Sequence, residues 1–574
     1  MQIAMAMPRT LSDTVVDGPL GALLRYPRVF LALFCLILFT PGLTSLPPLD
    51  RDESRYAQAT KQMMETGDFI EIQFQEEARN KKPVGIYWMQ SLSASVFSSA
   101  PFTEIWAYRI PSVIGAICVV LLVFGLGERL FDRETGLAAG GIMAATLLLI
   151  GEAHIAKTDS VQLACIVAAQ AMFAKFYFAD RFGEPRPGWA WSWALWGAVG
   201  LGILVKGPLT PFFCGMTVVA LSLWERRFGW IWHTRPIFGS GIIILIVLPW
   251  LLAIMLVTKG EFLEEAWGRD FAGKIVSSQE GHWGPPGYYL GLLPATFWPG
   301  SLFLVPAAIF AWANRADPVM RFLIAWAVPA WIVLELMSTK LPHYVLPLYP
   351  ALALLCAGAV VTGMRQGGMI FSHITAKIGI AAWLLVTLCI AFVLLVFVPA
   401  EYGAGTGLFL YALLLPVLLS AGFAAYFLFQ QDAGRALAAA LISATVLAVA
   451  ALGAAVPRLD QLKLSPRAAE LAASAGATAN RGEKLAIAGY AEPSFVFLAG
   501  TKTTLTTPEG AAQFLIDHSN SFALIDKETA DAGFRKVLTA KGYTPEALGQ
   551  VSGINYSKNR KIQLTLFRLR KSDN

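Results

Sequence analysis

Apolar runs of roughly 20 residues recur through most of this 574-residue chain, and they restrict its fold more than any other feature. A run of that length can cross the hydrocarbon core of a bilayer, about 30 Å thick, as a helix. Helices are expected because lipid offers no partners to backbone polar groups. With 56% hydrophobic and 15% charged residues, the chain differs from soluble globular proteins. The sequence therefore predicts an α-helical polytopic membrane protein.

About 13 transmembrane helices are expected between residues 29 and 456. The expected spans are residues 29–46, 108–130, 137–155, 161–179, 189–205, 209–224, 237–257, 289–312, 322–336, 344–364, 378–399, 408–429 and 437–456. The short loops on one side carry basic residues at Arg129, Arg133, Arg181, Arg186, Arg226, Arg227, Arg235, Arg315, Arg321, Arg365, Lys377 and Arg435. The positive-inside rule makes that side cytoplasmic. The outer face then holds the first loop (47–107), the segment 259–288 and the motif 338–344.

The pattern changes after residue 456 to short strands that alternate with alanine-rich helices. Strands are expected at 485–488, 522–525 and 563–568, and helices at 508–517 and 529–541. About 115 residues can bury a core of their own. We therefore expect a transmembrane domain at 1–456 and a small α/β domain at 457–574. An odd number of crossings places the α/β domain on the outer face.

Cysteine positions and charge distribution exclude several classes of protein. All six cysteines lie inside apolar runs and show no CxxC or Cys/His spacing, so they are expected in the core and not in disulfides or zinc sites. The formal charge of +6 is spread over short loops and is not gathered in one stripe. No nucleic-acid partner is expected.

The first outer loop contains the densest charge in the chain. Asp50, Asp52 and Glu53 alternate there with Arg51 and Arg55. Glycosyl transfer from a phosphate leaving group needs a carboxylate to accept a proton or hold a cation, and basic groups to neutralise the departing phosphate. A solvated loop with local salt bridges gives the same pattern, and these residues alone do not separate the two readings.

Further along the same loop, Lys81 and Lys82 precede Pro83, and the aromatic pair Tyr87 and Trp88 follows. A lysine supplies a point charge that suits a phosphate, and the aromatic pair suits a sugar face. The alternative is an interfacial helix whose lysines snorkel without binding any ligand. Taken by itself, the segment favours that alternative.

Other ionisable residues lie at the outer ends of apolar runs, where they mark a cavity unless they snorkel. Asp159 is the better candidate because an aspartate is too short to snorkel, whereas snorkelling explains Lys206 equally well. Lys340, His343 and Tyr344 cluster between two spans with three nearby prolines, and anion binding is the preferred interpretation. The candidates in these segments are Asp159, Lys206, Arg269, Lys340, His343 and Tyr344. Arg269 could clamp a phosphate with two hydrogen bonds.

Four motifs together resemble a known family. DRDESRYAQ follows the first span, KKPVGIYW lies in the same loop, KGP begins at Lys206, and STKLPHYVLPLYP joins two late spans. They resemble the polyprenyl-phosphate-sugar-dependent transferases of the GT-C fold, in particular the bacterial 4-amino-4-deoxy-L-arabinose transferases that modify lipid A. The resemblance covers most of the membrane region and the α/β domain.

This resemblance implies an inverting glycosyltransferase that moves aminoarabinose from undecaprenyl phosphate to a lipid A phosphate and confers polymyxin resistance. It implies a site and an α/β domain on the periplasmic side of the bacterial inner membrane. The expected catalytic residues are Asp52, Glu53 and Asp159, and the expected substrate-binding residues are Arg55, Lys81, Lys82, Tyr87, Lys206, Arg269, Lys340, His343 and Tyr344. Asp50 and Glu53 could also contribute an acidic pocket for the aminosugar. No cofactor is required, and a divalent metal stays open, although a site at His282 with Glu76 or Glu77 has no support from spacing.

Three other functions stay open. A related enzyme could transfer mannose or galacturonic acid to protein or to lipopolysaccharide core. A lipid flippase would carry charges through the depth of several helices. A scaffold would use its α/β domain to recruit proteins. Because the charges here lie at the outer ends of the spans, the sequence favours transfer at one face over a flippase.

Overall fold

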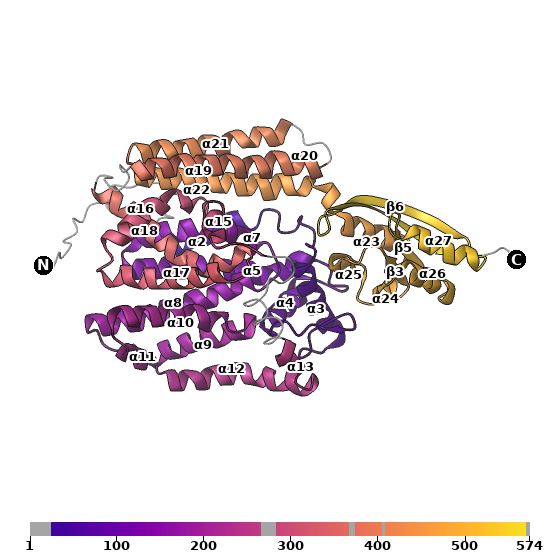
Figure 1. Ribbon diagram of the computed structural model, residues 1–574, viewed down its shortest axis with the longest axis horizontal. Coiled ribbons are helices and arrows are strands. Elements are labelled where there is room, and N and C mark those ends of the chain that lie inside the picture. The colour runs from indigo at the N-terminus through magenta and orange to yellow at the C-terminus, as the bar shows by residue number, and fades with distance from the viewer. Residues whose placement is uncertain (1–24, 266–282, 367–373, 404–407, 570–574) are drawn as a thin grey trace.

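A bundle of long helices with an α/β domain at one end forms the protein (Figure 1). The computed structural model describes residues 25–265, 283–366, 374–403 and 408–569. Its longer helices are α2 (Pro27–Phe39), α5 (Ile105–Leu130), α6 (Arg133–Ala145), α7 (Leu147–Ala153), α8 (Asp159–Phe182), α9 (Trp189–Lys206), α10 (Leu209–Glu225), α12 (Pro236–Val257), α15 (Tyr288–Thr296), α16 (Leu304–Ala313), α17 (Pro318–Leu336), α18 (Tyr349–Gln366), α19 (Ile374–Phe392), α21 (Leu408–Phe429) and α22 (Ala433–Ala448). Shorter connecting helices are α11 (Gly229–His233), α13 (Glu261–Leu263), α20 (Val398–Tyr402), η2 (Gly300–Phe303), η3 (Pro342–Leu348), η5 (Val393–Phe397) and η6 (Val449–Ala455).

The helical part confirms a multi-pass membrane protein. Within the described residues, 8 helices are long and apolar enough to cross a bilayer, or up to 10 when two bent pairs each count as one span. The remaining expected spans coincide with α2, α9 and α10, which have 13, 18 and 17 residues. Each expected span therefore matches a helix or a bent pair, and the total of about 13 stays a prediction.

The bend between α6 and α7 brings polar residues to the end of the bundle that faces the α/β domain. The two helices meet at an angle of 61°. Thr146 between them adopts an extended conformation, with φ −60° and ψ 121°, and the freed amide of Leu147 donates to the Trp298 carbonyl at 2.9 Å. Helix α7 then carries Glu152, and the turn after it carries Lys157. The apolar pattern predicts one span here but does not show the break.

The first loop folds into a small layer on this end of the bundle (Figure 1). It contains α3 (Asp52–Thr66), the two-stranded sheet of β1 (Gln73–Phe74) and β2 (Glu77–Ala78), and α4 (Gly85–Phe97). Helix α3 is buried along most of its length, although it is polar. Its burial follows from packing against the bundle on one side and the α/β domain on the other.

The C-terminal domain holds a five-stranded mixed sheet of order β4-β3-β5-β7-β6. Strands β3 (Leu485–Ala488), β4 (Thr504–Leu505) and β5 (Phe522–Asp526) are parallel, while β7 (Arg560–Leu569) runs antiparallel to β5 and to β6 (Pro545–Asn555). Its helices are α23 (Leu464–Ser474), α24 (Ala479–Gly482), α25 (Pro493–Ala499), α26 (Pro508–Asp517) and α27 (Asp531–Ala540). They enclose two apolar cores, as expected for a sheet covered on both faces.

The expected strands and helices of this domain are confirmed at β3, β5, β7, α26 and α27. Strand β6 is missing from the sequence prediction. Its residues PEALGQVSGIN include a proline and two glycines, which favour a loop, and a β-bulge lies between Ala547 and Gly549. Pairing along the whole of β7 overrides that local preference. The boundary between residues 456 and 457 remains our assignment.

Candidate active site

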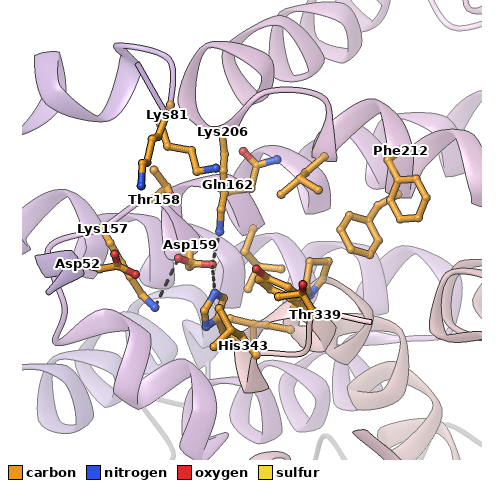
Figure 2. Close-up of a pocket in the computed structure, with 18 of the residues that line it drawn as sticks. Asp52, Lys81, Lys157, Thr158, Asp159, Gln162, Lys206, Phe212, Thr339 and His343 are labelled. Carbon is orange, nitrogen blue, oxygen red and sulfur yellow. Dashed lines mark hydrogen bonds and ion pairs between the residues drawn. The ribbon is translucent and has the colours of Figure 1, made fainter. Parts of the chain in front are cut away.

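A cavity of about 320 Å³ lies where the first loop meets the bundle. It is lined by residues of α3, the 79–82 segment, the start of α8, the end of α9, α10, α17 and η3. Six basic side chains and two carboxylates line it, at Arg55, Arg79, Lys81, Lys82, Lys157, Lys206, Asp52 and Asp159. Its apolar wall consists of Leu163, Leu209, Phe212, Phe213, Val333, Leu334, Met337, Leu341, Leu346 and Pro347. Figure 2 shows the charged cluster at one end and Phe212 well away from it.

Asp159 is the centre of the charged cluster. Its Oδ1 lies 2.6 Å from Lys206 Nζ and 3.7 Å from His343 Nε2, and its Oδ2 lies 3.6 Å from Lys157 Nζ (Figure 2). Asp159 is the first residue of α8, where a negative charge is favoured by the helix dipole. It is buried, so the surrounding positive groups offset the cost of removing its charge from water.

Lys206 reaches the cluster from the last turn of α9, where a positive charge is favoured. The helix ends there because Gly207 has φ 74° and ψ −145°, a conformation that side chains disfavour, and Pro208 follows. The KGP motif therefore marks the break between α9 and α10. That break places Lys206 beside Asp159 instead of at a lipid interface.

Glu152 is a functional candidate that the sequence prediction missed. It is buried, its Oε1 lies 3.1 Å from Lys157 Nζ, and His343 Nδ1 lies 4.0 Å from the same oxygen. Burial lowers the pKa of Lys157, but the Glu152 and Asp159 carboxylates outweigh it and hold that pKa above its ordinary value. A lone acid inside the apolar run 137–155 was the available signal.

Asp52 begins α3, and its exposed side chain lines the cavity next to Lys157 (Figure 2). Glu53 differs. It is buried, and its two oxygens lie 2.8 Å from Arg109 Nε and Nη2 and accept from the amides of Leu49 and Ala156, each at 2.8 Å. Glu53 does not line the cavity. We therefore assign Glu53 an anchoring role for the first loop in place of the expected catalytic one.

Lys81 and Lys82 both line the cavity, and so does Arg55. Tyr87, expected to bind substrate, is buried beneath this surface. Its hydroxyl accepts from Arg79 Nε at 3.3 Å, and its ring lies 5.3 Å from that of Tyr56. The Arg79 guanidinium lies 5.0 Å from the centre of the Tyr56 ring. Tyr87 therefore supports Arg79. Arg79 lines the cavity, whereas Tyr87, the predicted substrate-binding residue, does not.

Only some of the candidate residues in the motif 338–344 line the cavity. His343 and Tyr344 line the cavity, and their rings meet edge to face at 5.0 Å. Lys340 does not line it. Its Nζ donates to the carbonyls of Glu335, at 2.8 Å, and Met337, which follows the last residue of α17. Lys340 therefore caps the helix, a role that competes with binding substrate. Arg269 and His282 lie outside the described residues.

Among the described residues, no group of three or more His, Cys, Asp and Glu side chains has the arrangement to hold a metal ion. The six cysteines, all of which are described, are free thiols.

Comparison with known proteins identifies the family. Residues 27–259 match the family model of dolichyl-phosphate-mannose-protein mannosyltransferases. An undecaprenyl phosphate-alpha-4-amino-4-deoxy-L-arabinose arabinosyl transferase of Pseudomonas paraeruginosa is 30% identical over 443 residues, which are 74% of this chain and 75% of that relative. The chain belongs to this arabinosyl transferase family. A member from Erwinia tasmaniensis is 28% identical over 340 residues, which are 58% of this chain and 59% of the relative.

Solved structures agree on the fold of this arabinosyl transferase family member. ArnT from Cupriavidus metallidurans, bound to undecaprenyl phosphate, matches with a TM-score of 0.73 and 16% identity, covering 95% of this chain and 98% of that one. The oligosaccharyltransferase of Archaeoglobus fulgidus matches with a TM-score of 0.51 and 13% identity, covering 96% and 74%. The GT-C fold expected from the sequence is therefore confirmed.

Proposed function

We propose that this chain is an inverting glycosyltransferase that moves 4-amino-4-deoxy-L-arabinose from undecaprenyl phosphate to a phosphate of lipid A. The observation that carries the proposal is a single cavity with basic side chains at one end and an apolar wall beyond them. A polyprenyl phosphate needs both, because its phosphate is charged and its chain is not. The homologous transferases are named for aminoarabinose and undecaprenyl phosphate, and these names suggest the sugar and the carrier.

The donor phosphate binds chiefly to basic residues of the first loop that line the cavity. Lys157 and Lys206 pair with Glu152 and Asp159. The other basic residues that line the cavity are Arg55, Arg79, Lys81 and Lys82, and we assign the phosphate mainly to these four. Arginine and lysine complement each other here, since a guanidinium can grip two phosphate oxygens and an ammonium supplies a point charge.

The transfer is a direct displacement at the sugar carbon. An oxygen of the acceptor phosphate attacks that carbon, the bond to the carrier phosphate breaks, and its electron pair leaves with the carrier phosphate. The acceptor oxygen is already ionised near neutral pH, so no strong base is required. Asp52 orients the acceptor and stabilises the positive charge that develops on the sugar. One displacement inverts the configuration without a covalent intermediate.

In this proposal, Asp52 and Asp159 form the acidic pocket that binds the aminosugar. Asp50 and Glu53 were the expected contributors, but Asp50 bonds to Ser494 of the α/β domain and Glu53 to Arg109. The carboxylates that line the cavity are Asp52 and Asp159. The amino group of the donor would therefore pair with one of these two carboxylates.

Periplasmic placement of the site in a bacterial inner membrane is part of the proposal. Helix α8 begins with Asp159 at the cavity and carries Arg181 in its last turn, about 33 Å away at 1.5 Å per residue. Arg181 and Arg321 both reach Glu225 at that far end. The cavity and the arginine-rich loops therefore lie at opposite ends of membrane-length helices, as the positive-inside rule requires for an outer site. We assign 1–456 to the transmembrane domain and 457–574 to the periplasmic domain.

Mass spectrometry of lipid A tests the function. A polymyxin-sensitive Gram-negative strain without its own aminoarabinose transferase would express the wild type, Asp52→Asn, or the matched control Glu76→Gln, which alters an exposed acid of the same loop. We expect added aminoarabinose with the wild type and the control, and at least about a 100-fold loss with Asp52→Asn. Unmodified lipid A in all three strains, with each protein in the membrane, would contradict the proposal.

The match to the mannosyltransferase family model favours a second candidate, transfer of mannose to a protein hydroxyl. A hydroxyl is not ionised at neutral pH, so Asp52 would then act as a general base. Hexose on membrane proteins of the same strains, with unmodified lipid A, would favour this candidate. A flippase is the weaker alternative because the charges gather at one end of the bundle.

A further inference from the structure

The two residues before Asp52 are held from the α/β domain. The Asp50 amide donates to the Tyr556 hydroxyl at 2.6 Å, and the Asp50 carboxylate accepts from the Ser494 hydroxyl. Arg51 Nη2 donates to the Ser557 carbonyl at 2.8 Å. Tyr556 and Ser557 follow β6, and Ser494 lies in the first turn of α25, so two separate parts of the domain grip this short segment.

The gripped segment has a strained backbone. Arg51 has φ 68° and ψ −108°, a region that residues other than glycine rarely occupy. Arg51 is the residue immediately before α3, so this dihedral pair sets the direction in which Asp52 leaves the preceding chain. Glu53 is fixed on the other side by Arg109. Asp52 therefore lies between one anchor in the bundle and one in the α/β domain.

The domain anchor continues into a buried hydroxyl network. The Ser494 hydroxyl lies 2.6 Å from that of Ser465, which lies 2.7 Å from the hydroxyl of Tyr490. All three side chains are buried. Buried polar groups linked in this way specify one arrangement, because leaving any of them unpaired is costly. Asp50 is thus attached to the packed core of the domain and not to a surface loop.

We propose that the α/β domain positions Asp52 for catalysis, with Ser494 and Tyr556 as positioning residues that hold the strained Asp50–Arg51 backbone. The inference rests on the proposed role of Asp52 in glycosyl transfer. It gives a function to the Glu492-Pro493-Ser494 segment, which has no place in the cavity.

Simple docking of the domain is the competing explanation, and other contacts already provide it. Lys61 Nζ donates to the Phe497 carbonyl at 2.8 Å, and the Phe497 ring packs edge to face on Tyr108 at 5.4 Å. Gln75 Nε2 donates to the Thr503 carbonyl at 2.6 Å. These contacts lie farther along the first loop and at the start of α5, and they do not involve residues 50–52. Removing one hydroxyl from Tyr556 or Ser494 should therefore leave the domain docked.

The kinetic test uses purified full-length protein with the polyprenyl-phosphate donor and a lipid A acceptor. We expect Tyr556→Phe and Ser494→Ala to lower kcat by about 10- to 100-fold, with the donor KM within twofold and the melting temperature nearly unchanged. Tyr543→Phe, which removes an exposed tyrosine hydroxyl from the same domain, should behave as the wild type. Unchanged kcat in both test variants would overturn the proposal, as would a loss of kcat matched by a loss of folded protein.

Asp50 separates positioning from a direct chemical role. Asp50→Asn keeps an oxygen that can accept from Ser494, whereas Asp50→Ala does not. We expect Asp50→Asn to keep at least half of kcat and Asp50→Ala to lose as much as Ser494→Ala. Equal losses in the two variants would mean that the charge of Asp50 matters, and would contradict a positioning role.

Arg51→Gly is a rescue experiment. Glycine adopts positive φ without strain, so it should hold the required backbone with less help from the domain. We expect the double variant Arg51→Gly with Tyr556→Phe to have a kcat at least threefold higher than that of Tyr556→Phe alone. A double variant no better than Tyr556→Phe alone would show that the Arg51 backbone is not what the domain controls.

Hydrogen exchange separates failure of this inference from failure of the proposed function. Tyr556→Phe should raise the exchange rate of the amides at 50–56 at least fivefold, while the rest of the α/β domain keeps its protection. This readout needs no substrate. If the wild type transfers no aminoarabinose but exchange rises as expected, the proposed function fails and the positioning contact stands. Unchanged exchange would refute the positioning contact whatever the enzyme transfers.

Discussion

At the scale of single residues, three carboxylates in or beside the cavity have different roles because their surroundings differ. Asp52 is exposed to the cavity, Asp159 shares its charge with Lys206, and Glu53 is fully engaged by Arg109. A carboxylate that faces substrate must keep oxygens available, and only the first two line the cavity. The residue type alone predicts none of these differences, so the sequence could nominate the acids but not rank them.

The donor phosphate gives a first test among the lysines. Lys82 is half-buried and Lys81 exposed, although both line the cavity. A charge pair is stronger where water is excluded. We therefore expect Lys82→Ala to raise the donor KM about tenfold, close to 1.4 kcal/mol of binding free energy. Lys81→Ala should change it less than threefold. Equal effects in steady-state kinetics would assign the phosphate to both lysines.

Asp50 predicts a pH dependence of stability. Burial raises its pKa to about 6, and the nearby Glu492 charge adds to the shift, while hydrogen bonds from Ser494 and Tyr556 oppose it. The folded state thus holds the Asp50 proton more tightly than the unfolded state, and this contribution to stability is lost as pH rises from about 4 through 6.

The matched variant for this pH dependence is Asp50→Asn, which removes the titrating group. Between pH 4 and 8, the melting temperature of the variant should rise relative to that of the wild type as pH increases. The difference between the two should become constant above pH 7. Lys61, whose pKa burial lowers to about 8, acts in both proteins and cancels in the comparison. A constant difference at all pH values would show that folding does not raise the pKa of Asp50.

At the scale of elements, the sequence predicts what periodicity and length control. The spans, β3 and α26 follow their apolar patterns closely. It fails where distant segments decide the outcome: strand β6 forms because β7 pairs with it, and Arg109 matters because Glu53 reaches it from another segment. The sequence predicts Tyr87 and Lys340 at the substrate, but neither lines the cavity, because spacing does not show which way a side chain points.

The break between α9 and α10 offers a test of one element boundary. Gly207 has φ 74°, and a Cβ added there would meet no atom within 4 Å, so any cost of Gly207→Ala is conformational. We expect a loss of about 1–3 kcal/mol in stability, because this backbone region is essentially restricted to glycine, and reduced transfer as Lys206 shifts from Asp159.

Gly215→Ala is the matched control. Gly215 lies inside α10 with ordinary helical geometry and equally open space around its Cα, so alanine there should be neutral or slightly stabilising. Thermal unfolding in detergent and the lipid A assay would measure both variants. Equal behaviour of the two would show that the α9–α10 break tolerates a side chain.

At the scale of the whole molecule, the first loop lies between two bodies. The bundle holds Glu53 through Arg109, the α/β domain holds Asp50 through Ser494, and the cavity opens beside Asp52 between these anchors. The α/β domain and the cavity therefore share one side of the membrane. Any orientation of the chain places both on the same side.

Cysteine labelling tests that orientation directly. Lys502→Cys would place a thiol on the exposed surface of the α/β domain, and Arg315→Cys would place one in the exposed turn between α16 and α17. The natural cysteines lie within apolar spans, where a charged, membrane-impermeant maleimide does not reach them. In right-side-out spheroplasts we expect labelling of Lys502→Cys but not of Arg315→Cys, and the reverse in inside-out vesicles. A charged reagent distinguishes the two sides because the bilayer excludes it. Labelling of Lys502→Cys only in inside-out vesicles would place the cavity on the cytoplasmic side. A lipid A phosphate in the periplasm could then not be the acceptor.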